Sequence, residues 1–161
     1  MKTARISNRI VSEPRGPAYE ALIRYCAAEG ALCTLADLFP RSKAGRQASA
    51  HFLSLAEPYL DTMLMAERWP LGDPETGDPS QPTQLWRFVM NDAFAELLLD
   101  GPVGLYGWKS PKFPEDFAVY RKDGSVLLGT VVHEHLGWMN LSSEDASDVR
   151  LGLVEFEVMH R

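Results

Sequence analysis

The spacing of apolar residues changes at Pro102, and this change restricts the fold more than any other feature of the sequence. Before Pro102 the apolar residues recur about every 3.6 residues, which is the repeat of an amphipathic helix. After it they alternate with a period of two, the repeat of a β-strand. The pattern predicts an α+β fold, in which a helical N-terminal half, residues 17–99, packs on a small antiparallel sheet of three to five strands from residues 102–158.

Three helices are expected in the first half. The first covers residues 17–30, because proline is favoured at the first helical position and a helical apolar stripe follows it. Residues 52–64 form the strongest helical stripe, with a kink or a break at Pro58, which cannot donate a backbone hydrogen bond. The third helix is expected over residues 84–99, and a capping box predicts a short turn over residues 34–39.

The second half contains a hairpin signal. Asp123-Gly124 lies between the apolar runs 117–120 and 126–132, and Asp-Gly in that position is typical of a tight β-hairpin turn. A third strand is expected over residues 136–141, because one continuous strand would exceed the usual strand length. The turn before it then falls at His133-Glu134-His135.

The rest of the chain fits a single domain. Ser142 with Asp145 three residues later is a capping box for a short acidic helix, and residues 154–158 alternate as a last strand with one polar face. Residues 69–83 hold four prolines and two glycines and are expected to form an acidic loop between the halves. A chain of 161 residues has room for one α+β domain, residues 1–161.

The negative charge is concentrated in the second half. Residues 1–70 carry nine Lys and Arg against seven Asp and Glu, whereas residues 71–161 carry seven against fifteen. This asymmetry disfavours nucleic acid and anionic membranes and favours a basic protein partner. The alternative is that the charge serves only solubility.

Location and redox state follow from what the sequence lacks. Its basic start has no apolar run of the kind a secretory signal needs, and no run approaches the ~18 residues that span a bilayer, so we expect a cytoplasmic protein. The only cysteines, Cys26 and Cys33, have neither zinc-knuckle nor redox-motif spacing and are expected to be reduced core thiols. No cofactor motif is found, so no cofactor is predicted.

His133 and His135 are the only clustered candidates for metal ligands. An extended His-x-His places both rings on the same side of a strand, and a third ligand would have to come from His51, His160 or Asp116. The alternative is a polar turn between two strands. A tight turn would make the rings diverge and destroy the site.

No motif indicates covalent catalysis. There is no Gly-x-Ser-x-Gly elbow, and the carboxylate pairs Glu115-Asp116 and Glu144-Asp145 are adjacent residues whose side chains point apart. Residues 105–114 are aromatic and contain glycine and proline, so Tyr106 and Trp108 are candidate anchors for a partner. The alternative is that these rings cover the edge of the sheet.

Residues 114–134 run Pro-Glu-Asp-Phe-Ala-Val-Tyr-Arg-Lys-Asp-Gly-Ser-Val-Leu-Leu-Gly-Thr-Val-Val-His-Glu. This run resembles a hairpin segment of small uncharacterised bacterial proteins with the pattern PEDl.fyr.DGs.ll.ti.HE. The resemblance implies that His133 and Glu134 belong to a shared pattern. It implies no activity, because none is established for that family.

Two functions are compatible with these observations. The first is a non-enzymatic protein-binding module, similar to the immunity proteins that neutralise toxins, in which Glu144, Asp145 and Asp148 present an acidic surface to a basic partner and Tyr106 and Trp108 serve as anchors. The alternative is a metal-binding domain or metal-dependent enzyme that uses the His133-Glu134-His135 cluster. The oligomeric state is left open.

Overall fold

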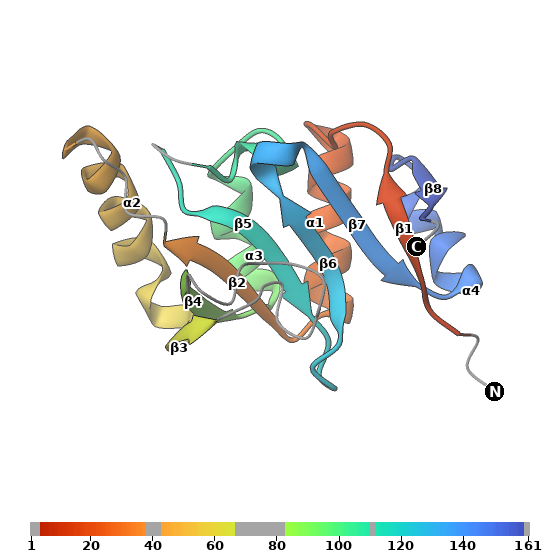
Figure 1. The fold of residues 1–161 in the computed structure, drawn as a ribbon, viewed down its shortest axis with the longest axis horizontal. Helices are drawn as coiled ribbons and strands as arrows, with labels where there is room; N and C mark the ends of the chain where they lie inside the picture. Colours follow the sequence, from red (N-terminus) through yellow and green to blue (C-terminus); the bar gives the residue numbers. More distant parts are fainter. Residues whose placement is uncertain (1–3, 38–42, 67–82, 110–111, 160–161) are drawn as a thin grey trace.

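The computed structural model describes residues 4–37, 43–66, 83–109 and 112–159. These residues form an eight-stranded antiparallel sheet with short helices spread along the chain (Figure 1). The strands are β1 (Ile6–Ile10), β2 (Leu32–Asp37), β3 (Leu60–Ala66), β4 (Thr83–Val89), β5 (Glu115–Tyr120), β6 (Val126–Val131), β7 (Leu136–Leu141) and β8 (Phe156–Val158). The helices are α1 (Pro17–Glu29), α2 (Lys43–Ala56), α3 (Asp92–Leu99) and α4 (Ser143–Ala146), with 3-10 turns η1 (Glu57–Tyr59), η2 (Leu105–Gly107), η3 (Val132–Glu134) and η4 (Val149–Leu151).

The sheet brings distant parts of the chain together. Its strands lie in the order β3-β4-β2-β5-β6-β7-β1-β8. β1 lies between β7 and β8, with Asn8 opposite Met139 on one side and Val158 on the other. The N-terminal and C-terminal segments therefore belong to the same sheet.

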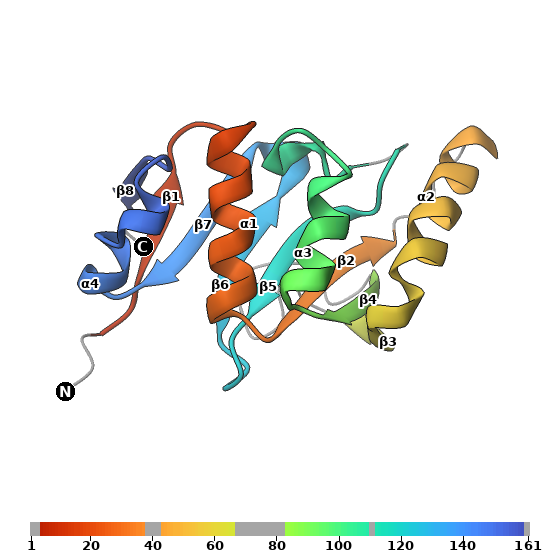
Figure 2. The ribbon, with the colours of Figure 1, turned by 180° about the vertical axis from the view of Figure 1, so that it is seen from behind.

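α1 and α3 lie side by side on one face of the sheet (Figure 2). Leu22 and Ile23 of α1 and Phe94 and Leu98 of α3 are completely buried against Phe117 and its neighbours on the strands. Each fully buried side chain of this size contributes roughly 1.5–3 kcal/mol, so this layer dominates the stability of the fold.

Ring contacts extend the core from the α1–α3 layer to the loop after α3. Trp108 is completely buried beside the rings of Phe52, Phe113 and Phe117. Its indole N–H donates to the Tyr19 hydroxyl at 2.9 Å, and that hydroxyl donates to the Leu98 carbonyl at 3.2 Å. These bonds join the loop to both α1 and α3.

The predicted arrangement of a helical half on a sheet of three to five strands is wrong. The sheet has eight strands, and β2, β3 and β4 come from residues 17–99. The helical stripe 52–64 is interrupted at Pro58, where α2 gives way to η1 and then to strand β3. The predicted turn at 34–39 is instead part of β2, as far as the structure describes it.

The expected helix over residues 84–99 also divides in two. Its first part is β4, and its second is α3, which begins after Asn91, whose side chain accepts a hydrogen bond from the Phe94 amide. β4 lies between β3 and β2 and is buried on both faces, with Leu85 on one and Trp86 on the other. A strand buried on both faces has no polar alternation, so its periodicity does not distinguish it from a helix.

Several local predictions are confirmed. α1 begins at Pro17, β5 and β6 flank the turn at 122–125, β7 covers residues 136–141, and Ser142 caps α4. The predicted acidic loop 69–83 lies outside the described residues except for Thr83, the first residue of β4. In the described part of the chain, no helix is both long and apolar enough to cross a membrane.

Both cysteines are buried free thiols, as the sequence indicates. Burial raises the pKa of Cys26 and of Cys33 far above that of an ordinary thiol, because it penalises the thiolate. We expect Ellman's reagent to label neither thiol in the native protein and both in guanidinium chloride, with the rate differing by at least about a hundredfold. Rapid labelling of either thiol under native conditions would contradict this placement.

Candidate functional site

A polar hollow of about 470 Å³ lies where four segments of the chain meet. Arg5 precedes β1, Tyr25 and Glu29 lie on the last turns of α1, Arg121 begins the β5–β6 turn, and Glu144 belongs to α4. The lining is more polar than apolar and carries both signs of charge. A hollow of this kind suits a charged ligand more than an apolar one.

The β5–β6 turn forms one wall. Gly124 has φ 85°, which glycine adopts without strain, and the Ser125 amide donates to the Asp123 carboxylate at 2.9 Å. Hydrogen bonds from Ser125, with a smaller contribution from Arg5, lower the pKa of Asp123 to about 2. Asp123 therefore stays charged and holds Arg5 at 3.4 Å beside the hollow.

Arg121 is the inner positive group of this wall. Its half-buried guanidinium donates to the carbonyls of Val126 at 3.1 Å and Asn140 at 2.6 Å. No described carboxylate lies within 4.0 Å of it. Burial, and then the charge of Arg5, lower its pKa, because both disfavour the cation. Arg121 therefore lines the hollow as a cation that is bonded to two backbone carbonyls.

Glu144 and Asp145 form the acidic wall. The Asp145 amide donates to the Ser142 hydroxyl at 3.1 Å, which fixes the first turn of α4. Within the described residues neither carboxylate has a cation within 4.0 Å, and Glu144 is exposed. Burial, then the charges of Asp145 and Glu29, raise the pKa of Tyr25 to about 12. The hollow is thus electrostatically negative on this side.

Asp148, the third predicted acidic residue, is already paired. Its carboxylate accepts from the Arg150 guanidinium at 2.8 Å, and Arg150 also donates to Glu29 at 2.8 Å. The same guanidinium lies 4.7 Å from the centre of the Tyr25 ring. The bonds from Arg150 lower the pKa of Asp148 to about 2, so Asp148 stays charged and paired with a cation that it shares with Glu29.

The two predicted aromatic anchors are buried. Trp108 lies in the core, and Tyr106 is 7% exposed. The Tyr106 hydroxyl has no hydrogen-bond partner among the described residues, and its backbone amide donates to Glu13 at 3.0 Å. Both rings belong to the hydrophobic core and are not exposed to a partner.

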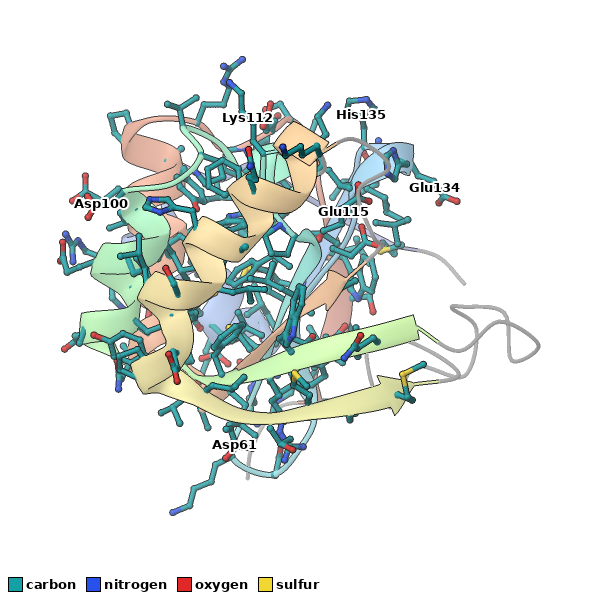
Figure 3. All side chains as sticks on the ribbon, turned by 90° about the vertical axis from the view of Figure 1, so that its left-hand side faces the viewer. Asp61, Asp100, Lys112, Glu115, Glu134 and His135 are labelled. Atoms are coloured by element: carbon teal, nitrogen blue, oxygen red, sulfur yellow. The ribbon has the colours of Figure 1, made fainter. Side chains whose placement is uncertain are left out.

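The His133-Glu134-His135 segment forms a tight turn. His133 makes a 2.6 Å hydrogen bond through Nε2 to the buried Glu115 carboxylate, although its own side chain is 66% exposed. His135 has φ 50° and places its ring edge-on to Tyr106, 5.9 Å between ring centres. Figure 3 shows Glu134 directed away from Glu115.

The two candidate metal ligands contact different side chains, His133 that of Glu115 and His135 that of Tyr106. Among the described residues no group of three His, Cys, Asp or Glu side chains is arranged to hold a metal ion. Asp116 accepts a hydrogen bond from the Val132 amide at 2.8 Å, His51 lies on α2, and His160 is outside the described residues. The metal alternative stays a prediction, which elemental analysis of protein purified without a histidine tag would test.

The paired carboxylates Glu115-Asp116 have a structural role that spacing alone did not indicate. Both are nearly completely buried at the start of β5, and both hold the turn after β6, through His133 and the Val132 amide. The two ends of the PED…HE segment therefore meet in space. A carboxylate that fixes one nitrogen of an exposed imidazole is also an arrangement used for general bases, but no hydroxyl or thiol nucleophile is bonded to His133 in the described structure.

The comparisons with known proteins found no match. No protein-family model matches the chain, and neither the curated proteins nor the solved structures include a significant relative. The resemblance of residues 114–134 to a bacterial hairpin segment stays a prediction.

The sequence reasoning missed Arg5, Tyr25 and Arg121. Arg121 was visible only as the residue before the Lys122-Asp123-Gly124 turn, and nothing local indicates that its side chain turns inward. Arg5 reaches Asp123 across 118 residues of sequence. Such a contact depends on β1 joining the far side of the sheet, which no local signal predicts.

Proposed function

We propose that this chain is a non-enzymatic protein-binding module that receives a basic segment of a partner protein at the polar hollow. The observation that carries the proposal is the pair of carboxylates on α4, Glu144 and Asp145, which line the hollow and have no described cation within ion-pair distance. A Lys or Arg side chain from a partner would supply that cation through charge-assisted hydrogen bonds.

The charges around the hollow explain why α4 is the side to which a cation would bind. Arg5 is paired with Asp123, and Arg150 is shared between Glu29 and Asp148. One negative charge therefore remains on the group formed by Arg150, Glu29 and Asp148, whereas the two carboxylates of α4 have no ion-pair partner among the described residues. The positive Arg121 and Lys122 face it across the hollow and favour a partner segment that carries a negative group beside its basic residue.

A basic toxin bound by its immunity protein is one pairing of this kind, and the acidic second half of the chain is consistent with it. The proposal places the interaction in the cytoplasm, where the buried thiols of Cys26 and Cys33 stay reduced. A toxin gene next to the gene for this chain would favour the immunity role.

The test uses the double variant Glu144→Lys/Asp145→Lys and a hexa-arginine peptide as the probe. We expect the variant to bind the peptide at least about tenfold more weakly in calorimetry, because two charge-assisted bonds are lost. The melting temperature should stay within a few degrees of that of the parent, because neither carboxylate forms a described ion pair. Asp148 is left unchanged, since its loss would release Arg150.

The matched control is Glu57→Lys/Glu134→Lys, which changes the net charge by the same amount at two exposed sites away from the hollow. It should weaken binding only slightly. Equal weakening by the two double variants would show that the peptide responds to net charge alone, and unchanged binding by the α4 variant would contradict the site.

A further inference from the structure

β3 is the outermost strand at one end of the sheet, and in Figure 3 it lies below β4 with its other edge directed away from β4. It pairs with β4 on its inner side, from Thr62 opposite Arg87 to Ala66 opposite Thr83. No strand among the described residues pairs with its other side. Within the described part of the chain, the backbone donors and acceptors along that side have no strand partner, and they are the groups that a further strand would use.

The two edges of the sheet differ in how they resist pairing. β8, at the opposite end, is only three residues long and carries Glu157, and short charged edges are a common defence against association. β3 is seven residues long. Its irregularity is confined to its start, between Leu60 and Thr62, so the remaining residues form a regular ladder.

The side chains of β3 also lack the usual protection. Met63 is 55% exposed and Met65 is 63% exposed, and both lie on the same face of the strand. The one charged residue, Asp61, forms an ion pair with Arg87 at 2.8 Å. A long, apolar and locally neutral edge is the kind that pairs with a further strand.

We propose that a second copy of this chain pairs with β3, antiparallel, about a two-fold axis through Met63. In this register residue 63 faces residue 63 of the second copy, and Asp61 faces Met65. No like charges are opposed, because the strand has no second charged residue. The pairing continues the sheet from one copy into the other and is isologous, as most homodimer interfaces are.

A second copy suits this edge better than a charged partner segment does. The edge is neutral once Asp61 and Arg87 are paired, so it offers nothing to attract the basic partner proposed for the hollow, to whose lining β3 contributes no residue. The overall charge of −6 opposes self-association only weakly, because salt screens the repulsion between charges more than about 8 Å apart at physiological ionic strength.

The experiment compares Met63→Lys, Met63→Glu and their equimolar mixture by sedimentation velocity over a concentration series. The unmodified chain is expected to form dimers that dissociate on dilution. Each single variant should be monomeric, because two like charges then face each other at the axis. The mixture should regain dimers, because lysine then faces glutamate.

Leu153→Lys and Leu153→Glu are the matched controls, because Leu153 is similarly exposed, at 65%, outside β3. Both should dimerise like the unmodified chain. The proposal is overturned if the unmodified chain stays monomeric, if the Met63 variants still dimerise, or if their mixture does not. If the Met63 variants do not fold, hydrogen exchange of the unmodified chain decides: amides of residues 60–66 should gain protection with concentration, and no gain overturns the proposal.

Discussion

Replacing Trp108 with alanine is expected to lower the free energy of unfolding by about 3–5 kcal/mol, the range for truncating a large buried aromatic side chain. Trp108 is completely buried, contacts the rings of Phe52, Phe113 and Phe117, and donates a hydrogen bond to Tyr19. Its loss would open a cavity between α2, the sheet and the loop after α3. Urea denaturation followed by far-UV circular dichroism measures the change.

Trp108→Phe separates packing from hydrogen bonding. Phenylalanine keeps most of the apolar contact but cannot donate to the Tyr19 hydroxyl, which still donates to the Leu98 carbonyl. A smaller loss, about 1–2 kcal/mol, is expected. Val103→Ala, at a residue that is 68% exposed in the same loop, should change stability by less than about 0.5 kcal/mol. A similarly small effect of Trp108→Ala would mean that the indole is not part of the core.

The position of Trp108 shows what an aromatic loop sequence leaves open. Residues 105–114 have the composition of a binding loop and equally that of a loop that closes a core. The choice depends on Phe52 of α2 and on Phe117 of β5, which are far away in the sequence and arrive through the fold. Sequence composition alone does not decide between the two.

The sequence correctly predicts the features that depend only on neighbouring residues. The Asp123-Gly124 turn, Pro17 at the start of α1 and Ser142 at the cap of α4 act through neighbouring backbone groups, so a short stretch of sequence contains the whole interaction. The turn at 133–135 followed from strand length. Each of these features needs no knowledge of the rest of the chain.

The strands of the first half are not predicted correctly, because each of them is stabilised by pairing with strands that are distant in the sequence. β2 is held between β4 and β5, and Thr34 shares a 3.3 Å hydrogen bond with Tyr120, 86 residues away. Leu85 and Trp86 fit a helical stripe as well as a strand buried on both faces. Tertiary contacts therefore decide between helix and strand where the local pattern fits both.

The residues of the candidate site could also be predicted only in part from the sequence. Glu144 and Asp145 were identified from local charge, and both line the hollow. Asp148 was identified by the same reasoning, but it is paired with Arg150 two residues later, which also donates to Glu29 of α1. Charge in a sequence therefore gives the sign of a surface, and the fold determines which charges stay available to a partner.

Replacing Asp116 with alanine is expected to lower the free energy of unfolding by about 2–4 kcal/mol, for two separable reasons. The buried carboxylate accepts a hydrogen bond from the Val132 amide, and leaving a buried amide unpaired costs about 1–3 kcal/mol. Asp116 also has φ 54°, a left-handed conformation that alanine adopts at a cost of roughly 1–2 kcal/mol. Urea denaturation again gives the total.

Two further substitutions at Asp116 separate the reasons. Asp116→Asn keeps an acceptor oxygen and tolerates the left-handed conformation, so it should lose less than about 1 kcal/mol. Asp116→Gly removes the acceptor, but glycine adopts the left-handed conformation without strain. Its free energy of unfolding should therefore lie between those of the asparagine and alanine variants. Because the Val132 amide begins the turn that carries His133, the alanine and glycine variants should also shift the imidazole resonances of His133, whereas the asparagine variant should not. Equal stability of all three variants would mean that neither the bond nor the backbone conformation holds the PED segment against the turn after β6.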